Sequence, residues 1–240
     1  NSDIYALQNI SFTIRKGEYL GIVGLSGSGK STLLHLIPRY FDATEGQITV
    51  DGTNIKDISL SKLRDMLGFV PQKGVLFSGP IASNIKFGDE NISDEDMYKA
   101  AEIAQALEFI EGKEDKFDSE ISQGGSNVSG GQKQRLSIAR ALAKNPKILL
   151  FDDSFSALDY KTDVKLRKTL REKMQDTTTI IVAQRIATIL NADKIIVMNE
   201  GKVVGIGKHQ ELLKTCPTYL EIAESQFSEE ELAKGGKHNE

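Results

Sequence analysis

Hydrophobic residues in the first third of the chain have the spacing of strands. Residues 10–14 alternate between apolar and polar side chains, residues 19–23 form a short apolar run, and residues 48–50 lead into the turn signal Asp51-Gly52. These patterns predict three strands.

The spacing becomes helical between residues 83 and 143. Ser93, with Asp96 three residues later, resembles a capping box at a helix start. A second helix is predicted from about Gly130 to Lys144, because Asn145-Pro146 would end it. The apolar residues on one face of the first helix are Met97, Ala100, Ala101 and Ala104.

Strand signals return at residues 148–151, 178–182 and 195–198, with a polar helix near residues 161–174. This alternation of strand and helix predicts a mostly parallel sheet covered by helices on both faces. We expect one domain whose α/β core is interrupted by a helical insertion. The expected parts are a core of residues 1–75 and 145–225, a helical subdomain of residues 76–144, and a frayed or added tail of residues 226–240.

Composition narrows the class of protein. The 240 residues, 39% hydrophobic and 27% charged, suffice for one buried core. The net charge of -4, without basic blocks, argues against nucleic acid as a partner. The sequence has neither an apolar run of the roughly 18 residues that a spanning helix needs nor a signal-peptide pattern. The single cysteine, Cys216, excludes an internal disulfide.

A glycine-rich segment at residues 24–31 fits the pattern G-x-x-x-x-G-K-[ST] between a predicted strand and an apolar helix. Its N–H groups can point inward at phosphates, Lys30 can reach the β and γ phosphates, and Ser31 can offer its hydroxyl to Mg²⁺. The alternative is a Gly/Ser-rich loop without a ligand, but a match to this motif rarely arises by chance in a chain of this length. The predicted nucleotide-binding residues are Gly24, Ser26, Gly27, Ser28, Gly29, Lys30, Ser31 and Thr32.

Asp152 ends the apolar strand signal at residues 148–151, where ligands of open parallel sheets bind. We expect its carboxylate to hold Mg²⁺ through water. An apolar strand that ends in aspartate is often only core plus a turn residue, but the upstream phosphate motif favours the functional interpretation.

Residues 127–135 distinguish the chain from other P-loop ATPases. They resemble the signature motif of ATP-binding cassette (ABC) proteins, with Val128 where leucine is usual. In that family the motif opens a helix and binds the γ-phosphate of a nucleotide held by the opposite subunit. The resemblance therefore implies a second ABC nucleotide-binding domain as partner. The residues that carry it are Ser129, Gly130, Gly131 and Gln132.

Two further motifs follow in the family's order. Gln72 lies in a segment that resembles the Q-loop, which approaches Mg²⁺ and links the core to the helical subdomain. Ser156, Ala157, Leu158 and Asp159 resemble the D-loop, which crosses to the partner. The resemblance covers essentially the whole chain and implies ATP and Mg²⁺ as cofactors. It also implies a P-loop NTPase (RecA-like) α/β fold, with a mostly parallel sheet, an N-terminal antiparallel β subdomain and an inserted α-helical subdomain.

Three segments resemble exporters more than importers or DNA-repair ATPases: residues 40–46, 77–85 and 118–125. The third occupies the position of the X-loop, which contacts the coupling helices of the membrane domain, although Gln123 replaces a common glutamate. The resemblance thus implies a transmembrane-domain partner and the cytoplasmic face of the cell membrane. A soluble ABC ATPase that acts as a switch stays an alternative. A P-loop kinase would leave residues 129–132 unexplained.

The aromatic residue that stacks on adenine is not assigned uniquely. Tyr5 is a candidate. Residues 6–12 resemble the segment that follows the stacking residue in exporters, so an aromatic residue before Asn1 is the other possibility.

The chain departs from the family at two catalytic positions. Asp153 replaces the glutamate that polarises water and is one methylene, about 1.5 Å, shorter. Gln184 replaces a histidine that holds the γ-phosphate and has no titratable proton. Since a displacement near 1 Å can cost about a hundredfold in rate, we expect slow hydrolysis.

Our hypothesis is that the chain is the degenerate-site subunit of a heterodimeric exporter, and the alternative is a homodimer that tolerates both substitutions. The predicted catalytic residues are Lys30, Asp153 and Gln184.

Overall fold

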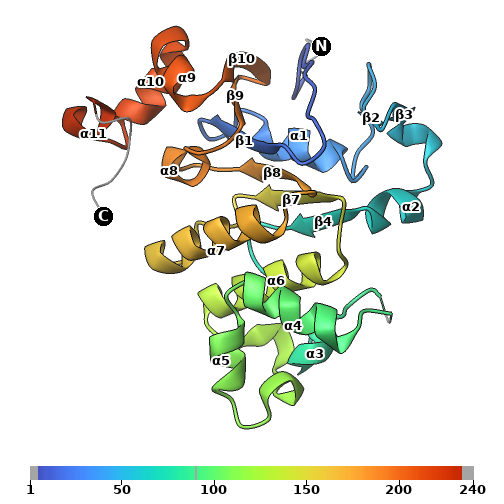
Figure 1. Cartoon of the computed structure of the whole chain (residues 1–240). Coiled ribbons are helices and arrows are strands. Elements are labelled where there is room, and N and C mark those ends of the chain that lie inside the picture. The colour runs from blue at the N-terminus through green and yellow to red at the C-terminus, as the bar shows by residue number, and fades with distance from the viewer. Residues whose placement is uncertain (1–4, 90, 234–240) are drawn as a thin grey trace. The chain divides into compact units, whose positions relative to one another are not determined.

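The computed structural model describes residues 5–89 and 91–233. Its chain forms two compact units. The first unit comprises Asn1–Leu63 and Thr178–Glu240, and the second comprises Arg64–Thr177. Figure 1 labels the elements of both units.

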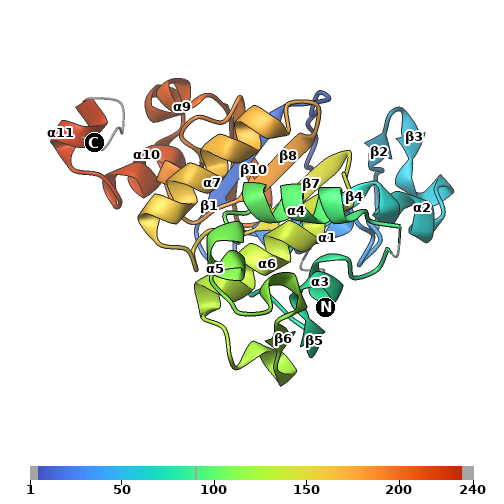
Figure 2. The ribbon, with the colours of Figure 1, turned by 60° about the horizontal axis from the view of Figure 1, so that its bottom comes forward.

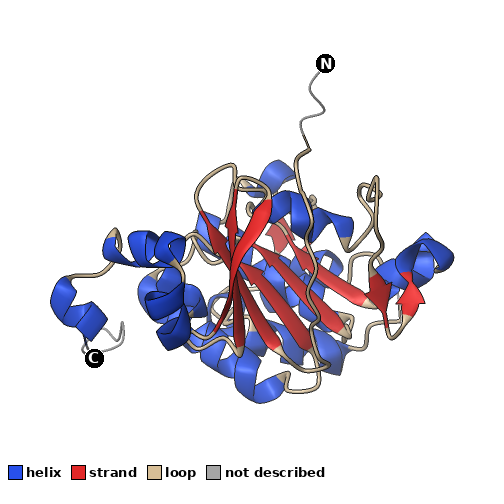
Figure 3. Ribbon diagram, turned by 90° about the horizontal axis from the view of Figure 1, so that it is seen from above, coloured by secondary structure: helices blue, strands red, loops and turns tan. Residues whose placement is uncertain are grey.

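The first unit contains strands in the order β10-β9-β1-β8. Figure 3 colours strands red and helices blue. β1 (Tyr19–Gly24) runs parallel to β8 (Thr178–Val182) and to β9 (Lys194–Asn199), and β10 (Lys202–Gly207) is antiparallel to β9. β1, β8 and β9 are apolar and largely buried, as expected for parallel strands covered on both faces. The predicted mostly parallel sheet is confirmed.

Helices of the first unit pack against these strands. α1 (Lys30–Leu36) contacts β1 and β8, and α8 (Ile186–Ile189) contacts β1. α9 (His209–Thr215) lies against β10, and α10 (Pro217–Glu224) lies against β1 and β9. The part of the chain predicted as a tail contains a further short helix, α11 (Glu229–Ala233). Residues 234–240 of that predicted tail lie outside the described residues.

An antiparallel hairpin confirms the strand and turn signals around residue 50. β2 (Thr49–Val50) pairs with β3 (Thr53–Asn54), and a short 3-10 helix, η1 (Ile55–Asp57), follows. Asp51 and Gly52 have φ angles of 49° and 78°. Positive φ at both central residues is the geometry of the tight hairpin turn that matches strand twist.

The strand predicted at residues 10–14 is wrong, because these residues form no hydrogen-bonded ladder. Their exposure still alternates, so the apolar side chains turn inward as the pattern indicated. The Lys194 side chain donates to the Thr13 carbonyl at 2.8 Å, so a side chain takes up a carbonyl that a neighbouring strand would use.

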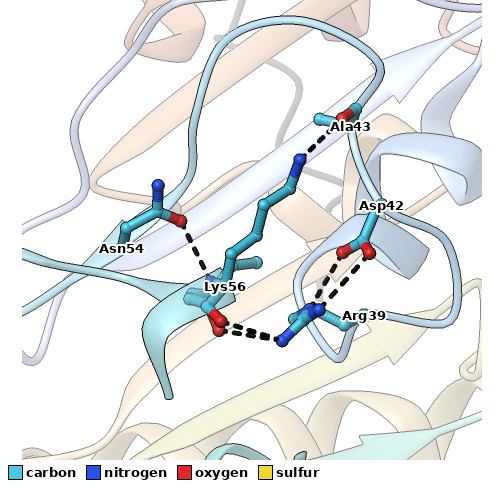
Figure 4. A network of polar contacts seen from close by, with 6 residues as sticks. Arg39, Asp42, Ala43, Asn54 and Lys56 are labelled. Carbon is cyan, nitrogen blue, oxygen red and sulfur yellow. Dashed lines mark hydrogen bonds and ion pairs between the residues drawn. The ribbon is translucent and has the colours of Figure 1, made fainter. Parts of the chain in front are cut away.

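A polar network ties the loop after α1 to the hairpin (Figure 4). Arg39 donates to both carboxylate oxygens of Asp42, at 2.9 and 3.3 Å, and to the Ile55 carbonyl at 3.2 Å. Lys56 donates to the Ala43 carbonyl at 3.0 Å. The hydrogen bond from Arg39 lowers the pKa of the Asp42 carboxyl. These contacts fix the segment that resembles exporters at residues 40–46.

Four short strands form two pairs in the second unit. β4 (Leu67–Val70) runs parallel to β7 (Ile148–Asp152). β5 (Gly79–Pro80) is antiparallel to β6 (Glu120–Ile121). α2 (Leu60–Asp65) spans the boundary between the units along the chain.

In the second unit, α6 (Gly130–Ala143) contacts α3 (Ile81–Ile85), α4 (Asp94–Ile103) and β4. Figure 2 shows α4 beside α6. Ser93 caps α4 by accepting the Asp96 N–H, and the predicted apolar face of α4 is buried, which confirms that helix. The remaining elements are α5 (Leu107–Glu111), α7 (Tyr160–Lys173), and the 3-10 helices η2 (Lys116–Asp118) and η3 (Gln123–Gly125).

Among the helices that the structure describes, none has the length and apolarity needed to cross a membrane.

Candidate functional site

The glycine-rich segment of residues 24–31 connects β1 to α1 in the first unit, which is the context its motif requires. Gly24 is packed so closely that a Cβ there would lie 2.3 Å from the Met198 carbonyl oxygen. Gly29 has a φ of 97° and precedes α1 without any side-chain cap. A side chain at either position would disturb the loop, so glycine is required for its curled shape.

Lys30 turns back onto its own loop. Its ammonium group donates to the carbonyls of Gly24 and Leu25, at 2.8 and 2.9 Å, and it is only 9% exposed. A buried ammonium held against a glycine-rich loop at the start of a helix supplies the positive charge that phosphate recognition uses.

Gln184 follows β8 in the same unit and is exposed. The preceding residue, Ala183, donates its N–H to the Ile22 carbonyl of β1 at 3.0 Å. The turn that carries Gln184 therefore starts beside β1, the strand that leads into the glycine-rich loop.

The carboxylates of the candidate site lie in the second unit. Asp152 is the last residue of β7 and Asp153 follows it, and both are buried. The Gln72 side-chain amide donates to Asp153 Oδ2 at 3.0 Å, so the structure brings together two of the predicted site residues. Asp153 has a φ of 49°, a left-handed conformation that aspartate adopts more readily than most residues.

Gln134, which the motif analysis did not single out, holds the segment around Gln72. Its side chain is 1% exposed, donates to the Pro71 carbonyl at 3.0 Å and accepts the Gly74 N–H at 2.8 Å. The Ser154 hydroxyl donates to the Val70 carbonyl at 2.8 Å from the other side. A polar residue on the mostly apolar buried face of α6 is the sequence signal that could have revealed Gln134.

The signature-like residues form the start of α6. Ser129 is its N-cap and makes a capping box with Gln132: the Ser129 hydroxyl accepts the Gln132 N–H, and the Gln132 side chain accepts the Ser129 N–H. Ser129 and Gly130 are exposed, so a ligand could reach this end of the helix. The helix dipole and the first N–H groups of α6 favour an anion there.

The D-loop-like residues leave β7 and lead into α7. Ser156 donates to the Asp153 carbonyl at 2.9 Å, Leu158 is buried, and Ala157 is exposed. Asp159 is the N-cap of α7, and the hydrogen bond from the Thr162 N–H lowers the pKa of its carboxyl.

Two of the segments that resemble exporters meet in the second unit. Strand β5 lies within residues 77–85 and pairs with β6, which lies within residues 118–125. Lys133, on α6, donates to the Gly124 carbonyl at 2.8 Å, and Asn127 donates to the Glu120 carbonyl at 2.8 Å. The X-loop-like segment is thus tied directly to the signature-like helix.

The predicted metal ligands have the chemistry that Mg²⁺ prefers. Ser31 in the first unit carries a hydroxyl oxygen, and Gln72 and Asp152 in the second unit carry amide and carboxylate oxygens, which are hard ligands suited to this ion. In the described part of the chain, no group of three or more His, Cys, Asp or Glu residues could hold a metal ion by itself. Mg²⁺ in phosphate-binding sites takes only one or two carboxylates, together with phosphates and waters.

A mostly parallel α/β fold with a phosphate-binding loop between the first strand and helix defines a P-loop NTPase. The family profile described as "ABC transporter" matches residues 7–156, more than half of the chain. The chain belongs to the ABC transporter family.

Named relatives agree with this assignment. An ABC transporter ATP-binding protein of Mycobacterium tuberculosis is 45% identical over 228 residues, which cover 94% of this chain and 39% of that protein. An ATP-dependent lipid A-core flippase of Syntrophus aciditrophicus is 40% identical over 232 residues, which cover 97% of this chain and 39% of that protein. This chain therefore spans about two fifths of the length of these relatives.

Among solved structures, a bacterial Atm1-family ABC exporter with ATP bound resembles this fold with a TM-score of 0.90 and 39% sequence identity. The match covers 95% of this chain and 40% of that one. The similarity to exporters inferred from residues 40–46, 77–85 and 118–125 is confirmed.

Proposed function

We propose that this chain is the nucleotide-binding domain of an ABC exporter and that it binds MgATP through residues 24–31. The observation that carries the proposal is the loop itself, with the buried Lys30 ammonium among its carbonyls. Lys30 exchanges those carbonyls for the β and γ phosphates. Ser31, Gln72 and Asp152 would be the ligands of Mg²⁺, and the ion would supply positive charge to balance the charge that develops on the phosphates.

The site that this chain builds from its own loop hydrolyses ATP slowly. Asp153 and Gln184 take the catalytic positions. Asp153 keeps the charge of the family's glutamate but is one methylene shorter, and Gln184 has no titratable proton. The hydrogen bond from Gln72 to Asp153 further restrains the short carboxylate.

The chain works as half of a dimer with a second nucleotide-binding domain. Its residues 129–132, at the start of α6, of which Ser129 and Gly130 are exposed, grip the γ-phosphate in the partner's competent site, and residues 156–159 cross to the partner. The partner is a different chain, because a heterodimer keeps one efficient site while this one is impaired.

The transporter's membrane domain docks on the second unit, so the domain lies at the cytoplasmic face of the membrane. The support comes from the segments at residues 77–85 and 118–125, which pair with each other and expose Phe77 at 44% and the neighbouring Phe87 at 51%. Motion of that surface reaches the signature through Lys133 and Asn127.

Nucleotide binding and turnover by the 240-residue chain test the proposal. We expect MgATP binding that Lys30→Ala weakens at least tenfold, since hydrogen bonds to a charged group contribute about 1.5–3 kcal/mol. We expect only slow phosphate release. Lys16→Ala, at an exposed lysine, is the matched control.

Brisk steady-state hydrolysis by the chain alone would instead support a homodimeric ATPase. Absence of MgATP binding would refute the proposed function.

A further inference from the structure

The side chain of Gln226, which lies beyond the end of α10, holds the turn that carries Gln184. Its amide nitrogen donates to the Gln184 carbonyl at 2.8 Å, and its amide oxygen accepts the Ile186 N–H at 2.8 Å. Both contacts link residues 40 or more positions apart within the first unit. No motif in the sequence indicates them.

The two hydrogen bonds match the chemistry of a carboxamide, which offers a donor and an acceptor side by side. They bracket Arg185, whose backbone is extended at φ -96° and ψ 125°. A neighbouring strand pairs with a residue in this same way, using the carbonyl before it and the N–H after it. The Gln226 side chain thus acts as a one-residue strand partner just after β8.

The hydrogen bond to Ile186 also gives a partner to a backbone N–H group at the start of a helix. Ile186 begins α8, and its N-cap residue Arg185 makes no side-chain cap hydrogen bond. N–H groups in the first turn of a helix have no partner within the helix. Gln226 supplies one from a distant part of the chain.

Both sides of the contact are anchored. Phe227 is 6% exposed, and the N–H groups of Gln226 and Phe227 donate to the Ala223 carbonyl at 3.0 and 2.9 Å. On the other side, Ile186 and Ile189 are fully buried and α8 packs on β1. Gln226 therefore connects two fixed segments.

We propose that Gln226 is a positioning residue that aims Gln184 at the γ-phosphate, so that the segment after α10 helps the site distinguish ATP from ADP. The proposal rests on the proposed function of nucleotide binding. A neutral amide attracts a phosphate only within hydrogen-bond distance and with good alignment, so Gln184 depends on a fixed backbone more than a charged residue would. The hydrogen bond to the Gln184 carbonyl fixes the backbone of Gln184, and this backbone sets the direction of the Gln184 side chain.

The test measures the dissociation constants of MgATP and MgADP for the 240-residue chain and its variants. We expect Gln226→Ala to lower the preference for ATP over ADP roughly 3- to 10-fold, the loss of about one ordinary hydrogen bond, with ADP affinity unchanged. Gln226→Met, which keeps the side-chain length, should do the same. Gln210→Ala, at an exposed glutamine of α9, is the matched control and should change neither constant.

A double-mutant cycle separates positioning from a general structural role. Once Gln184 is replaced in Gln184→Ala, the further change Gln226→Ala should leave the ATP preference unaltered. An unchanged preference in both single variants at Gln226, or equal loss of ATP and ADP affinity, would overturn the inference. If the unmodified chain binds neither nucleotide, the proposed function itself fails; if it binds both and only the Gln226 result is negative, this inference alone fails.

Discussion

At the scale of single residues, Asp153 is the position where the local geometry and the expected chemistry conflict. Its left-handed backbone suits aspartate, and its carboxylate accepts from Gln72. The shorter side chain is thus well accommodated by the fold even though it gives less reach toward an attacking water.

Restoring both family residues should raise hydrolysis. We expect the double variant Asp153→Glu with Gln184→His to release phosphate at least about tenfold faster than the unmodified chain, because roughly 1 Å of misplacement costs up to about a hundredfold. Steady-state phosphate release at saturating MgATP is the measurement. Asp176→Glu, at an exposed aspartate of the second unit, is the control. No increase would mean that neither substitution limits the rate.

The N-cap at Asp159 gives a pH-dependent prediction. The Thr162 N–H lowers the pKa of the Asp159 carboxyl, so its ionised form stabilises the fold above the unfolded-state pKa, near 3.9, and this contribution disappears as pH falls through the folded-state value. We expect the difference in Tm between the unmodified chain and Asp159→Asn to shrink between pH 5 and pH 3. Melting curves at several pH values measure this difference.

Asp176→Asn serves as the control for charge removal at a site without a cap. A difference between the Asp159→Asn and unmodified chains that grows toward low pH would contradict the assigned hydrogen bond.

At the scale of elements, Gln134 joins α6 to the backbone on both sides of Gln72. We expect Gln134→Leu to lower the free energy of unfolding by about 2 kcal/mol or more, because it leaves a buried carbonyl and N–H without their hydrogen bonds. Chemical denaturation measures the change. Gln175→Leu, at an exposed glutamine of the same unit, should have an effect within about 0.5 kcal/mol.

An equally small effect of Gln134→Leu would show that water replaces the side chain at Pro71 and Gly74. The hydrogen bonds of Gln134 would then have no structural role.

Strands with continuous apolar sequences could be predicted, and strands with weak side-chain signals could not. β1, β7, β8 and β9 each contain a run of apolar residues, so their side chains alone identified them. β10 carries two glycines and β4 has only four residues before Pro71, so neither gave a usable pattern. These two strands are specified by pairing with β9 and β7.

The strand expected at residues 10–14 failed for the opposite reason. Its alternation reports which side chains turn inward, but a ladder also needs a neighbouring strand in register.

The candidate site also contains residues that the sequence could predict and residues that it could not. Residues 24–31 could be predicted to bind phosphate from the spacing of glycine, lysine and serine, and residues 129–132 from the resemblance to the ABC signature motif. The supporting contacts of Gln134 and Gln226 could not, because each hydrogen-bonds to backbone groups 40 or more residues away along the chain. Backbone groups carry no sequence signal, so their partners become visible only in the fold.

At the scale of the whole molecule, the proposed heterodimer makes the two phosphate-binding motifs of this chain serve different nucleotides. Residues 24–31 would bind the ATP of the impaired site, and the start of α6 would complete the partner's competent site. Damage to the two motifs should then have unequal consequences for the assembled transporter.

In the full-length transporter with its partner chain, we expect Ser129→Arg to reduce ATP hydrolysis more than Gln184→Ala does. The arginine side chain would fill the exposed N-cap position of α6 and remove the hydroxyl that caps the helix, which blocks the partner's efficient site. In the proposed heterodimer, Gln184→Ala would change only the site that turns over slowly. Steady-state hydrolysis by the assembled complexes shows which variant loses more activity. Ser126→Arg, at an exposed serine just before the motif, controls for added charge and bulk.

A larger loss in Gln184→Ala than in Ser129→Arg would place the efficient site on this chain, and the roles of Asp153 and Gln184 would then have to be exchanged with those of the partner.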